Sequence, residues 1–537
     1  MTQQQPIFIL PENTQRFLGK DAQRNNIMAA KAVAETVRTT LGPKGMDKMI
    51  VDSLGDITVT NDGVTILKEM QIEHPAAKMI VEVAKTQDEQ VGDGTTTAVI
   101  LAGELLKNAE KLLDMNIHPT IITKGYAVAN ERAQFLLGLM GENVSLNDTE
   151  TLKKIAITSM IGKHGSGREK LATLLLHAVQ EVVENGKVSK DSIKFEKKVG
   201  GGIEDSELIH GMVIDKERVN SAMPEKVPNA KIALIDGALE VKAPETDTKI
   251  QISDPMQLQG FLDQEERILR EMVEKVKVSG ATVMFCQKGI DDVAQYYLAK
   301  AGIYATRRVK KSDMELIAKA TGAKIVSKAS ELTAMDLGEA GVVEELKVNE
   351  EQLTFIRNCK NPKAVTMIIR GGTEHVVEEI ERALVDSLSC IIASLQTGKV
   401  VGGAGAAEVE LARGLRAFAT SLSGREQLAV LAFADAIEIV PRTLAENAGL
   451  DPIDILTELK ARHDAGLKWF GVDVNTGTVQ DSWANGVIEP LKIKTQAVKS
   501  ATEVAELILR IDDVIAGVGD RGHGAGPRGP GMPDMDM

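Results

Sequence analysis

Apolar side chains recur at the spacing of an α-helix in two long parts of the chain, one toward each end. In the first part, helices are predicted at residues 25–38, 76–87, 96–113 and 119–140. In the last third, they are predicted at residues 374–395, 408–421, 425–447 and 452–465. Strand-like segments at residues 49–52 and 57–60, and on either side of Asn475-Thr476-Gly477, predict two β-hairpins.

The middle of the chain alternates short β-branched runs with short helical segments. Strands are predicted at residues 231–236, 281–287, 304–309, 323–327 and 364–370, and helices at 290–300 and 313–320. This alternation predicts a compact α/β domain. The flanking helices form either one domain assembled from both ends of the chain or two helical domains in series. Periodicity alone does not choose between these two arrangements.

A further helical pattern at residues 255–276 carries an apolar stripe that includes Phe261 and Leu262. Packing inside its own domain is the commonest reason for such a stripe. The alternative is an arm that binds apolar protein segments or packs on a neighbouring subunit. Residues 517–537 are rich in Gly, Pro, Met and Asp, and this segment is predicted to be disordered.

Composition and charge exclude several classes of protein. The 537 residues suggest three or four domains, and the net charge of −14 argues against a nucleic-acid partner. No apolar run reaches the roughly 18 residues of a membrane span, and the first residues lack a secretory pattern. We therefore expect no membrane partner. Cys286, Cys359 and Cys390 show no disulfide framework and no CxxC spacing, which favours the cytoplasm.

The strongest chemical motif is GDGTTTA at residues 92–98, directly before a helical segment. Its glycines let backbone N–H groups approach a ligand, and a helix N-terminus attracts an anion such as phosphate. An aspartate beside a phosphate would repel it unless a cation lay between them. Asp93 is therefore a candidate ligand for Mg²⁺. The alternative is a capped helix after a turn.

Other motifs are ambiguous on their own. The sequence TLGPKG at residues 40–45 ends a helix, and VGGAGA at residues 401–406 opens one without matching GxGxxG. Asn61-Asp62-Gly63 follows a strand and is typical of a tight turn. Asp386 lies on an otherwise apolar helical face, where it is either ion-paired or a general base in a cleft. The chain contains no P-loop, GxSxG or HExxH motif.

Together the motifs resemble those of the group II chaperonins, in particular the archaeal thermosome subunits, over nearly the whole chain. The resemblance rests on eight strings in order: TLGPKGMDKM at 40–49, NDGVTIL at 61–67, VGDGTTT at 91–97, KGIDD at 288–292, ATRRV at 305–309, ATGA at 320–323, GVIEP at 486–490 and IDDVI at 511–515. Each string is weak alone, but eight in order at fitting spacing are specific.

The resemblance implies a multidomain α and α/β chaperonin-like fold. Its parts would be a helical equatorial domain (1–146 and 403–516), a small intermediate domain (147–215 and 368–402), an α/β apical domain (216–367) with a helical lid protrusion at about 245–278, and a disordered tail (517–537). It also implies an ATP-driven chaperone that encloses unfolded or partly folded proteins in two stacked rings. The rings would contain copies of this chain or paralogous subunits, and no separate lid co-chaperonin.

The resemblance further implies an ATP hydrolase that uses Mg²⁺. Asp93 would hold the metal ion, while Asp62 and Asp386 would position and activate the attacking water. The nucleotide would be contacted by Thr40, Leu41, Gly42, Pro43, Asn61, Gly94, Thr95, Thr96, Thr97, Lys163, Gly403, Asp473, Val474 and Glu489. Of these, Lys163 would sense the γ-phosphate and Glu489 would contact the ribose.

One departure from the family pattern is Gly403-Ala404-Gly405, where the family usually has three consecutive glycines. The extra methyl group crowds a backbone that approaches the nucleotide, which leaves nucleotide affinity and domain motion open. Two rival functions are less consistent with the sequence. A non-hydrolysing scaffold of the same fold would be indicated by loss of Asp62, Asp93 or Asp386, and all three are present. A metabolite kinase leaves the amphipathic arm without a role.

Overall fold

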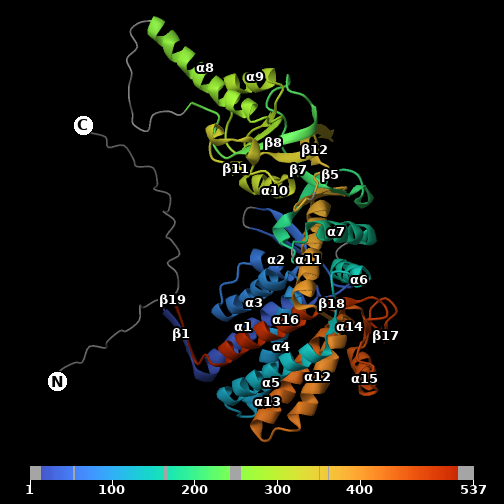
Figure 1. Ribbon diagram of the computed structural model, residues 1–537. Coiled ribbons are helices and arrows are strands. Elements are labelled where there is room, and N and C mark those ends of the chain that lie inside the picture. Colours follow the sequence, from blue (N-terminus) through green and yellow to red (C-terminus); the bar gives the residue numbers. More distant parts are fainter. Residues whose placement is uncertain are drawn as a thin grey trace, which may run out of the picture.

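The computed structural model describes residues 14–52, 55–162, 167–184, 186–241, 255–349, 351–360 and 362–517. Three predictions fall outside these residues: Lys163, the segment 245–254 of the predicted protrusion, and the tail from residue 518 onward. The molecule is elongated, with a helical part at one end and a sheet with a long helix at the other (Figure 1).

Helices from both ends of the chain build the helical part. They are α1 (Gly19–Arg38), α2 (Gly63–Glu69), α3 (Pro75–Val91), α4 (Thr95–Asp114), α5 (Pro119–Met140), α12 (Ala406–Ala419), α13 (Arg425–Ile437), α14 (Ile439–Asn447), α15 (Pro452–Asp464) and α16 (Leu491–Leu509). One hydrophobic core contains buried residues of both groups. Tyr126 of α5, for example, meets Phe433 of α13 edge to face, with ring centroids 5.5 Å apart. The alternative of two helical domains in series is therefore wrong.

Three two-stranded sheets border the helical part. β1 (Thr14–Leu18) pairs with β19 (Asp513–Gly517), so the two described ends of the chain lie side by side. The two predicted hairpins are confirmed: β2 (Lys48–Val51) pairs with β3 (Ile57–Thr60), and β16 (Phe470–Asp473) pairs with β17 (Thr478–Asp481). All three pairs are antiparallel.

The predicted α/β part contains a seven-stranded sheet of order β10-β9-β8-β12-β13-β7, in which β11 also pairs with β8. Its elements are β7 (Gly211–Ile214), β8 (Lys226–Ile235), β9 (Val283–Cys286), β10 (Tyr304–Thr306), β11 (Ile325–Val326), β12 (Gly338–Val348), β13 (Glu351–Arg357), α9 (Asp292–Lys300) and α10 (Lys311–Thr321). β8 to β11 were predicted, and they pair in parallel. The antiparallel β12–β13 pair was missed, because Glu344 and Glu345, whose side chains are largely buried in ion pairs, interrupt the apolar pattern of β12.

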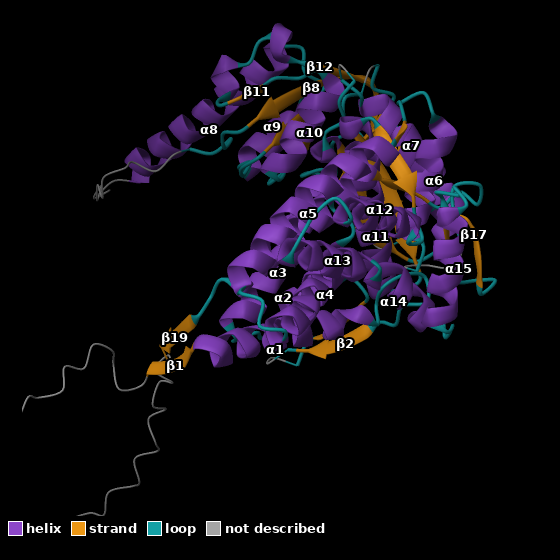
Figure 2. Ribbon diagram, turned by 90° about the horizontal axis from the view of Figure 1, so that it is seen from below, coloured by secondary structure: helices purple, strands orange, loops and turns teal. Residues whose placement is uncertain are grey.

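α8 (Pro255–Val278) projects from this sheet as an arm (Figures 1 and 2). Leu269, Val273 and Val276 in its second half are buried in the core beneath it, whereas Phe261 and Leu262 farther out are 43% and 50% exposed. The two halves of the helix therefore differ in their surroundings. The second half packs within the domain, and the first half leaves Phe261 and Leu262 exposed, so the partner-binding interpretation stays a prediction.

α11 (Glu374–Thr397) runs from a three-stranded sheet down to the helical part (Figure 1). The elements around it are α6 (Thr149–Met160), α7 (Arg168–Val182), β4 (Glu142–Asn143), β5 (Ile193–Val199), β6 (Glu207–Ile209), β14 (Val365–Gly371), β15 (Lys399–Gly402) and β18 (Ile488–Pro490). A second core joins α6, α7 and α11. The predicted domain boundaries stay predictions. Within the described part of the chain, no helix is long and apolar enough to cross a membrane.

Candidate active site

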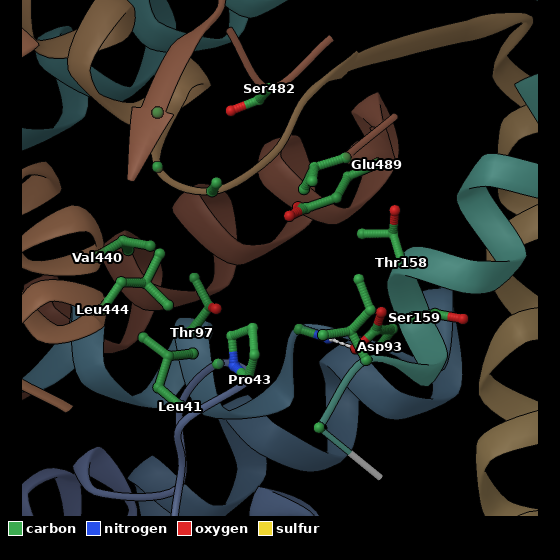
Figure 3. Close-up of a pocket in the computed structure, with 18 of the residues that line it drawn as sticks. Leu41, Pro43, Asp93, Thr97, Thr158, Ser159, Val440, Leu444, Ser482 and Glu489 are labelled. Carbon is green, nitrogen blue, oxygen red and sulfur yellow. Dashed lines mark hydrogen bonds between the residues drawn. The ribbon is translucent and has the colours of Figure 1, made fainter. Parts of the chain in front are cut away.

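A cavity of about 620 Å³ lies where the helical part meets α6 and α11 (Figure 3). The predicted site residues that line it are Thr40, Leu41, Gly42, Pro43, Asn61, Asp62, Asp93, Gly94, Thr95, Thr96, Thr97, Asp473, Val474 and Glu489. Gly403 does not line the cavity, although its neighbours Ala404 and Gly405 do, and Asp386 lies outside the lining. Segments hundreds of residues apart in the sequence thus meet around one space.

We call the wall formed by Asp62 and residues 93–97 the α4 side. Gly94 precedes the first turn of α4 with a left-handed backbone (φ +76°), and a Cβ added there would lie 2.6 Å from Ile493. A glycine is therefore required both by the backbone angle and by the packing. Because Gly94 has no side chain to cap the helix, the first N–H groups of α4 face the cavity with their partial positive charge.

Asp93 is held in place by hydrogen bonds at the N-terminus of this helix. Its Oδ1 accepts a hydrogen bond from the Gly94 N–H at 2.7 Å, and its Oδ2 accepts one from the Cys390 thiol at 3.3 Å. Its carbonyl oxygen accepts from the buried Gln87 amide at 2.8 Å. The described residues contain no group of three His, Cys, Asp or Glu side chains that could hold a metal. A single carboxylate at a helix N-terminus is compatible with Mg²⁺, which binds few protein ligands and shares phosphate oxygens, and Asp93 stays a predicted metal ligand.

Asp62 is the N-cap of α2 and not part of a tight turn, so the turn alternative for this motif is wrong. Its Oδ2 accepts hydrogen bonds from the Thr65 N–H at 3.0 Å and the Thr65 hydroxyl at 2.7 Å. Its Oδ1 accepts from the Thr95 hydroxyl at 3.3 Å. These bonds fix the carboxylate at the cavity wall and join it to the first turn of α4.

The loop after α1 closes the same side. Asn447 donates to the carbonyl oxygen of Leu41 at 2.9 Å and anchors this loop on α14. Gly42 has a left-handed backbone (φ +81°) and packs against Leu444. Asn61 donates to the Gly162 carbonyl at 3.2 Å, so the segment preceding residue 163 lies at the cavity.

The opposite wall, which we call the β18 side, consists of Glu489, Lys494, the 404–405 turn and the β16–β17 hairpin. Asp473 builds the hairpin turn, since its carboxylate accepts from the Asn475 N–H at 2.9 Å and the Thr476 hydroxyl at 2.9 Å. Its side chain is therefore committed to the turn. Val474 beside it presents an apolar surface to the cavity.

Glu489 forms an ion pair with Lys494, which also pairs with Glu408 at 2.8 Å. Burial alone would lower the pKa of Lys494, but the two carboxylates outweigh it and raise the pKa above its ordinary value. The lysine is therefore charged, and the β18 side contains a buried carboxylate–ammonium–carboxylate group.

Ala404 has a left-handed backbone (φ +56°), which costs a residue other than glycine about 1 to 2 kcal/mol. The Val472 N–H donates to its carbonyl oxygen at 2.9 Å and holds the turn against β16. The departure from three glycines thus places a strained residue in the cavity wall.

Asp386 is half-buried on α11 and shares a helical face with Arg382 and Cys390, one turn away on either side. Arg382 donates to the Thr60 hydroxyl at 3.5 Å, and the Cys390 thiol reaches Asp93. The face that carries Asp386 is thus turned toward the α4 side, although its carboxylate does not line the cavity.

Sequence reasoning missed several residues of the cavity wall. They include Thr158, Ser159, Cys390, Gln480 and Lys494. Cys390 belongs to no disulfide or CxxC pattern, and Thr158, Ser159 and Gln480 belong to no motif. Lys494 lies five residues after Glu489 in the sequence. This spacing indicates an ion pair only once β18 and α16 are known.

Comparison with known proteins agrees with this arrangement. Residues 33–518 match the model of the TCP-1/cpn60 chaperonin family. The chain is 60% identical to thermosome subunit beta of Archaeoglobus fulgidus, over 99% of both chains. It is 62% identical to a thermosome subunit of Methanopyrus kandleri (95% of this chain, 94% of the relative) and 59% identical to one of Methanocaldococcus jannaschii (98% of both).

An uncapped helix N-terminus beside two fixed carboxylates defines a cavity suited to a phosphate compound with a divalent cation. The protein belongs to the TCP-1/cpn60 chaperonin family. The resemblance to archaeal thermosome subunits is thereby confirmed.

Proposed function

We propose that this protein is an ATP-driven molecular chaperone that binds and hydrolyses Mg-ATP in the cavity between its α4 and β18 sides. The observation that carries the proposal is the meeting of Asp93, Asp62 and the open N-terminus of α4 around one cavity of about 620 Å³. Membership of the chaperonin family supports the same function.

In this proposal the α4 side takes the phosphates. The N–H groups and hydroxyls of Thr95, Thr96 and Thr97 would donate to phosphate oxygens, together with the loop at residues 40–43. Asp93 would hold Mg²⁺, which, when bound, offsets the repulsion between carboxylate and phosphate and polarises the phosphate. Lys163 stays a proposed γ-phosphate contact, and Gly403 a proposed backbone contact.

Two carboxylates would handle the attacking water. Asp62 is fixed by Thr65 and Thr95, so it can orient a water molecule and accept its proton without moving. Asp386 would complete the arrangement from α11, because its helical face already touches the α4 side through Arg382 and Cys390. A small movement of α11 would bring it in, which would couple hydrolysis to closure.

Apolar exposed side chains support binding of unfolded proteins. Phe261 and Leu262 on the arm, and Val293 and Tyr296 on α9, are 39–56% exposed. Non-native chains expose apolar groups that such a surface would bind. We propose that the arm is a built-in lid, which makes a separate lid co-chaperonin unnecessary, and that the sheet part is the apical domain of the predicted scheme.

Assembly into two stacked rings of this chain or of paralogous subunits is supported by unpaired edges on the helical part. The β2–β3 hairpin exposes Met49 (68%) and Ile57 (55%), and the β1–β19 pair exposes Leu18 (57%) and Ile515 (54%). Exposed apolar two-stranded sheets are surfaces that another chain can cover. Cys286, Cys359 and Cys390 are buried and form no disulfide bond, which is compatible with a cytoplasmic location.

The proposal is tested by measuring ATP turnover and protease protection of a non-native protein on one preparation. Phe261→Ser/Leu262→Ser changes only the exposed half of the arm. It should keep wild-type turnover yet lose ATP-dependent protection of the bound protein. The matched control, Glu265→Ser/Arg267→Ser, alters exposed polar residues of the same arm and should protect normally. A wild-type protein that neither hydrolyses ATP nor protects would contradict the proposed function.

A further inference from the structure

A buried lysine lies in the cavity wall on the β18 side. Lys494 lies in the first turn of α16 and is 7% exposed, while Glu408, in the first turn of α12, is 4% exposed. The ammonium group pairs with Glu408 Oε1 at 2.8 Å and with Glu489 Oε2. Three charges from three elements therefore meet in a place from which water is largely excluded.

The arrangement is asymmetric. Within the described residues, the Glu408 carboxylate has no hydrogen-bond partner apart from this ion pair, so its charge is available to balance the lysine. Glu489 is more exposed (22% of its side chain) and lines the cavity (Figure 3). The group as a whole keeps one negative charge, and Glu489 is the member that a ligand can reach.

The two oxygens of Glu489 have different surroundings. Oε2 is bound to Lys494, whereas a Cβ added to Gly403 would lie 2.6 Å from Oε1. Oε1 is therefore packed against the bare backbone of residue 403, in a space that a side chain would fill. The lysine holds one oxygen of Glu489, a residue that lines the cavity, so the remaining acceptor capacity of this carboxylate is left for a donor.

We propose that Lys494, charge-balanced by Glu408, is a positioning residue that aims the Glu489 carboxylate at the ribose hydroxyls, and so sets the preference for ribonucleotides over nucleotides lacking those hydroxyls. The inference rests on the proposed function, because it deepens the role of the same cavity. A site built to hydrogen-bond a hydroxyl rejects the analogue that lacks it, provided that the acceptor is held in place.

The test compares the dissociation constants of ATP and 2′,3′-dideoxy-ATP for the assembled full-length protein. Lys494→Met removes the charge at nearly constant length. It should reduce the preference for ATP over the dideoxy analogue by about tenfold, the loss of one hydrogen bond to a charged acceptor. Affinity for the dideoxy analogue should stay at the wild-type level. If Lys494 only stabilised the fold, its loss would weaken the binding of both nucleotides equally and leave the ratio of the two dissociation constants unchanged.

Because Lys494→Met leaves Glu408 buried without its partner, a second variant keeps the test decisive. Glu408→Gln/Lys494→Met removes both buried charges and retains Glu489, and it should show the same loss of preference. Lys499→Met is the matched control, since this lysine lies on the same helix and is 56% exposed. It should keep the wild-type ratio.

The outcomes separate this inference from the proposed function. A folded Lys494→Met or double variant with the wild-type ratio overturns the positioning role. Wild-type protein that binds ATP and the dideoxy analogue equally overturns it as well, while ATP binding itself stands. Wild-type protein that binds neither nucleotide contradicts the proposed function first.

Discussion

On the α4 side of the cavity, all the groups except Asp62 are consecutive in the sequence, whereas the β18 side joins Glu489 and Lys494 to the distant Glu408. Asp93 and the first turn of α4 follow one another within the GDGTTTA run. Glu408, Glu489 and Lys494 meet only after α12, β18 and α16 have packed together. A single cavity thus combines a wall determined by local sequence with a wall determined by tertiary packing.

The two walls also differ in how they hold charge. On the α4 side, Asp62 and Asp93 accept hydrogen bonds from neutral groups, namely Thr65, Gly94 and Cys390. These contacts hold both carboxylates in place at the cavity wall, where we propose that Asp93 binds a cation. On the β18 side, Lys494 compensates the carboxylates, so we expect that wall to recognise hydroxyl groups and not metal ions.

The largest effect is expected from Asp62→Asn. Asparagine is as good an N-cap as aspartate, so α2 should keep its stability while the wall loses a charge and a proton acceptor. ATP turnover should fall about thousandfold, within the range for loss of a general base. Steady-state kinetics and a thermal melt on the same preparation measure both effects.

Asp56→Asn, an exposed carboxylate in the β2–β3 hairpin, is the matched control and should turn over ATP normally. If Asp62→Asn hydrolysed ATP at the wild-type rate, Asp62 would have no catalytic role.

Asp386→Asn should slow hydrolysis by about a hundredfold with little change in ATP affinity, because the lost contact is to water and not to the nucleotide. Particles should stay intact. Glu374→Gln, near the start of the same helix, serves as the control. A variant that fails to assemble but whose few intact particles hydrolyse ATP at the wild-type rate would favour a purely structural ion pair for Asp386.

A smaller effect is expected beneath the β18 side. The buried His463 links Glu410 at 2.9 Å to the Phe470 carbonyl of β16 at 2.9 Å. Burial alone would raise the pKa of Glu410, but His463 and Arg413 lower it to about 2. The resulting stability is fully present above the ordinary carboxyl pKa and is lost as the pH falls toward 2.

Glu410→Gln should therefore lower the free energy of unfolding by about 2 kcal/mol at pH 7 and much less near pH 2. Denaturant titrations at several pH values measure this dependence. Glu458→Gln, on the exposed side of α15, is the control. An equal loss at pH 7 and pH 2 would show that the ionised carboxylate is not what stabilises this wall.

The smallest effect is expected from Ala404→Gly. It relieves the left-handed alanine but adds freedom to the unfolded chain, so the free energy of unfolding should rise by at most about 1 kcal/mol. Nucleotide affinity should change little. A destabilised variant in thermal melts would show that the methyl group packs favourably and that the strain is minor.

The contrast between the walls explains how far the sequence could predict this molecule. Helical and strand periodicity located α4, α8 and β8, because those signals are local. The β12–β13 pair was missed, since the ion-paired Glu344 and Glu345, whose side chains are largely buried, interrupt the alternation in β12. Periodicity could not decide that α5 and α13 share a core, because that contact joins residues about 300 positions apart.

The same limit applies to the site. Asp93 could be selected from charge and helix-terminus arguments alone, whereas Asp473 and Glu489 came from the family resemblance. Lys494 and Cys390 escaped both approaches, because a buried ion pair and a thiol–carboxylate contact leave no motif. The family resemblance predicted which residues form the site, and the structure shows which side chains hold those residues in place.

The central claim, that the α4 side holds Mg-ATP through Asp93, is tested most directly by calorimetric titration of ATP with Mg²⁺ and with a chelator. Wild-type protein should bind ATP at least about tenfold more tightly with Mg²⁺. Asp93→Asn keeps an acceptor for the Gly94 N–H and should lose most of that gain in affinity. Its affinity for ATP in the presence of the chelator should equal that of the wild-type protein. Failure of the wild-type protein to bind ATP, or an undiminished Mg²⁺ effect in Asp93→Asn, would contradict the claim.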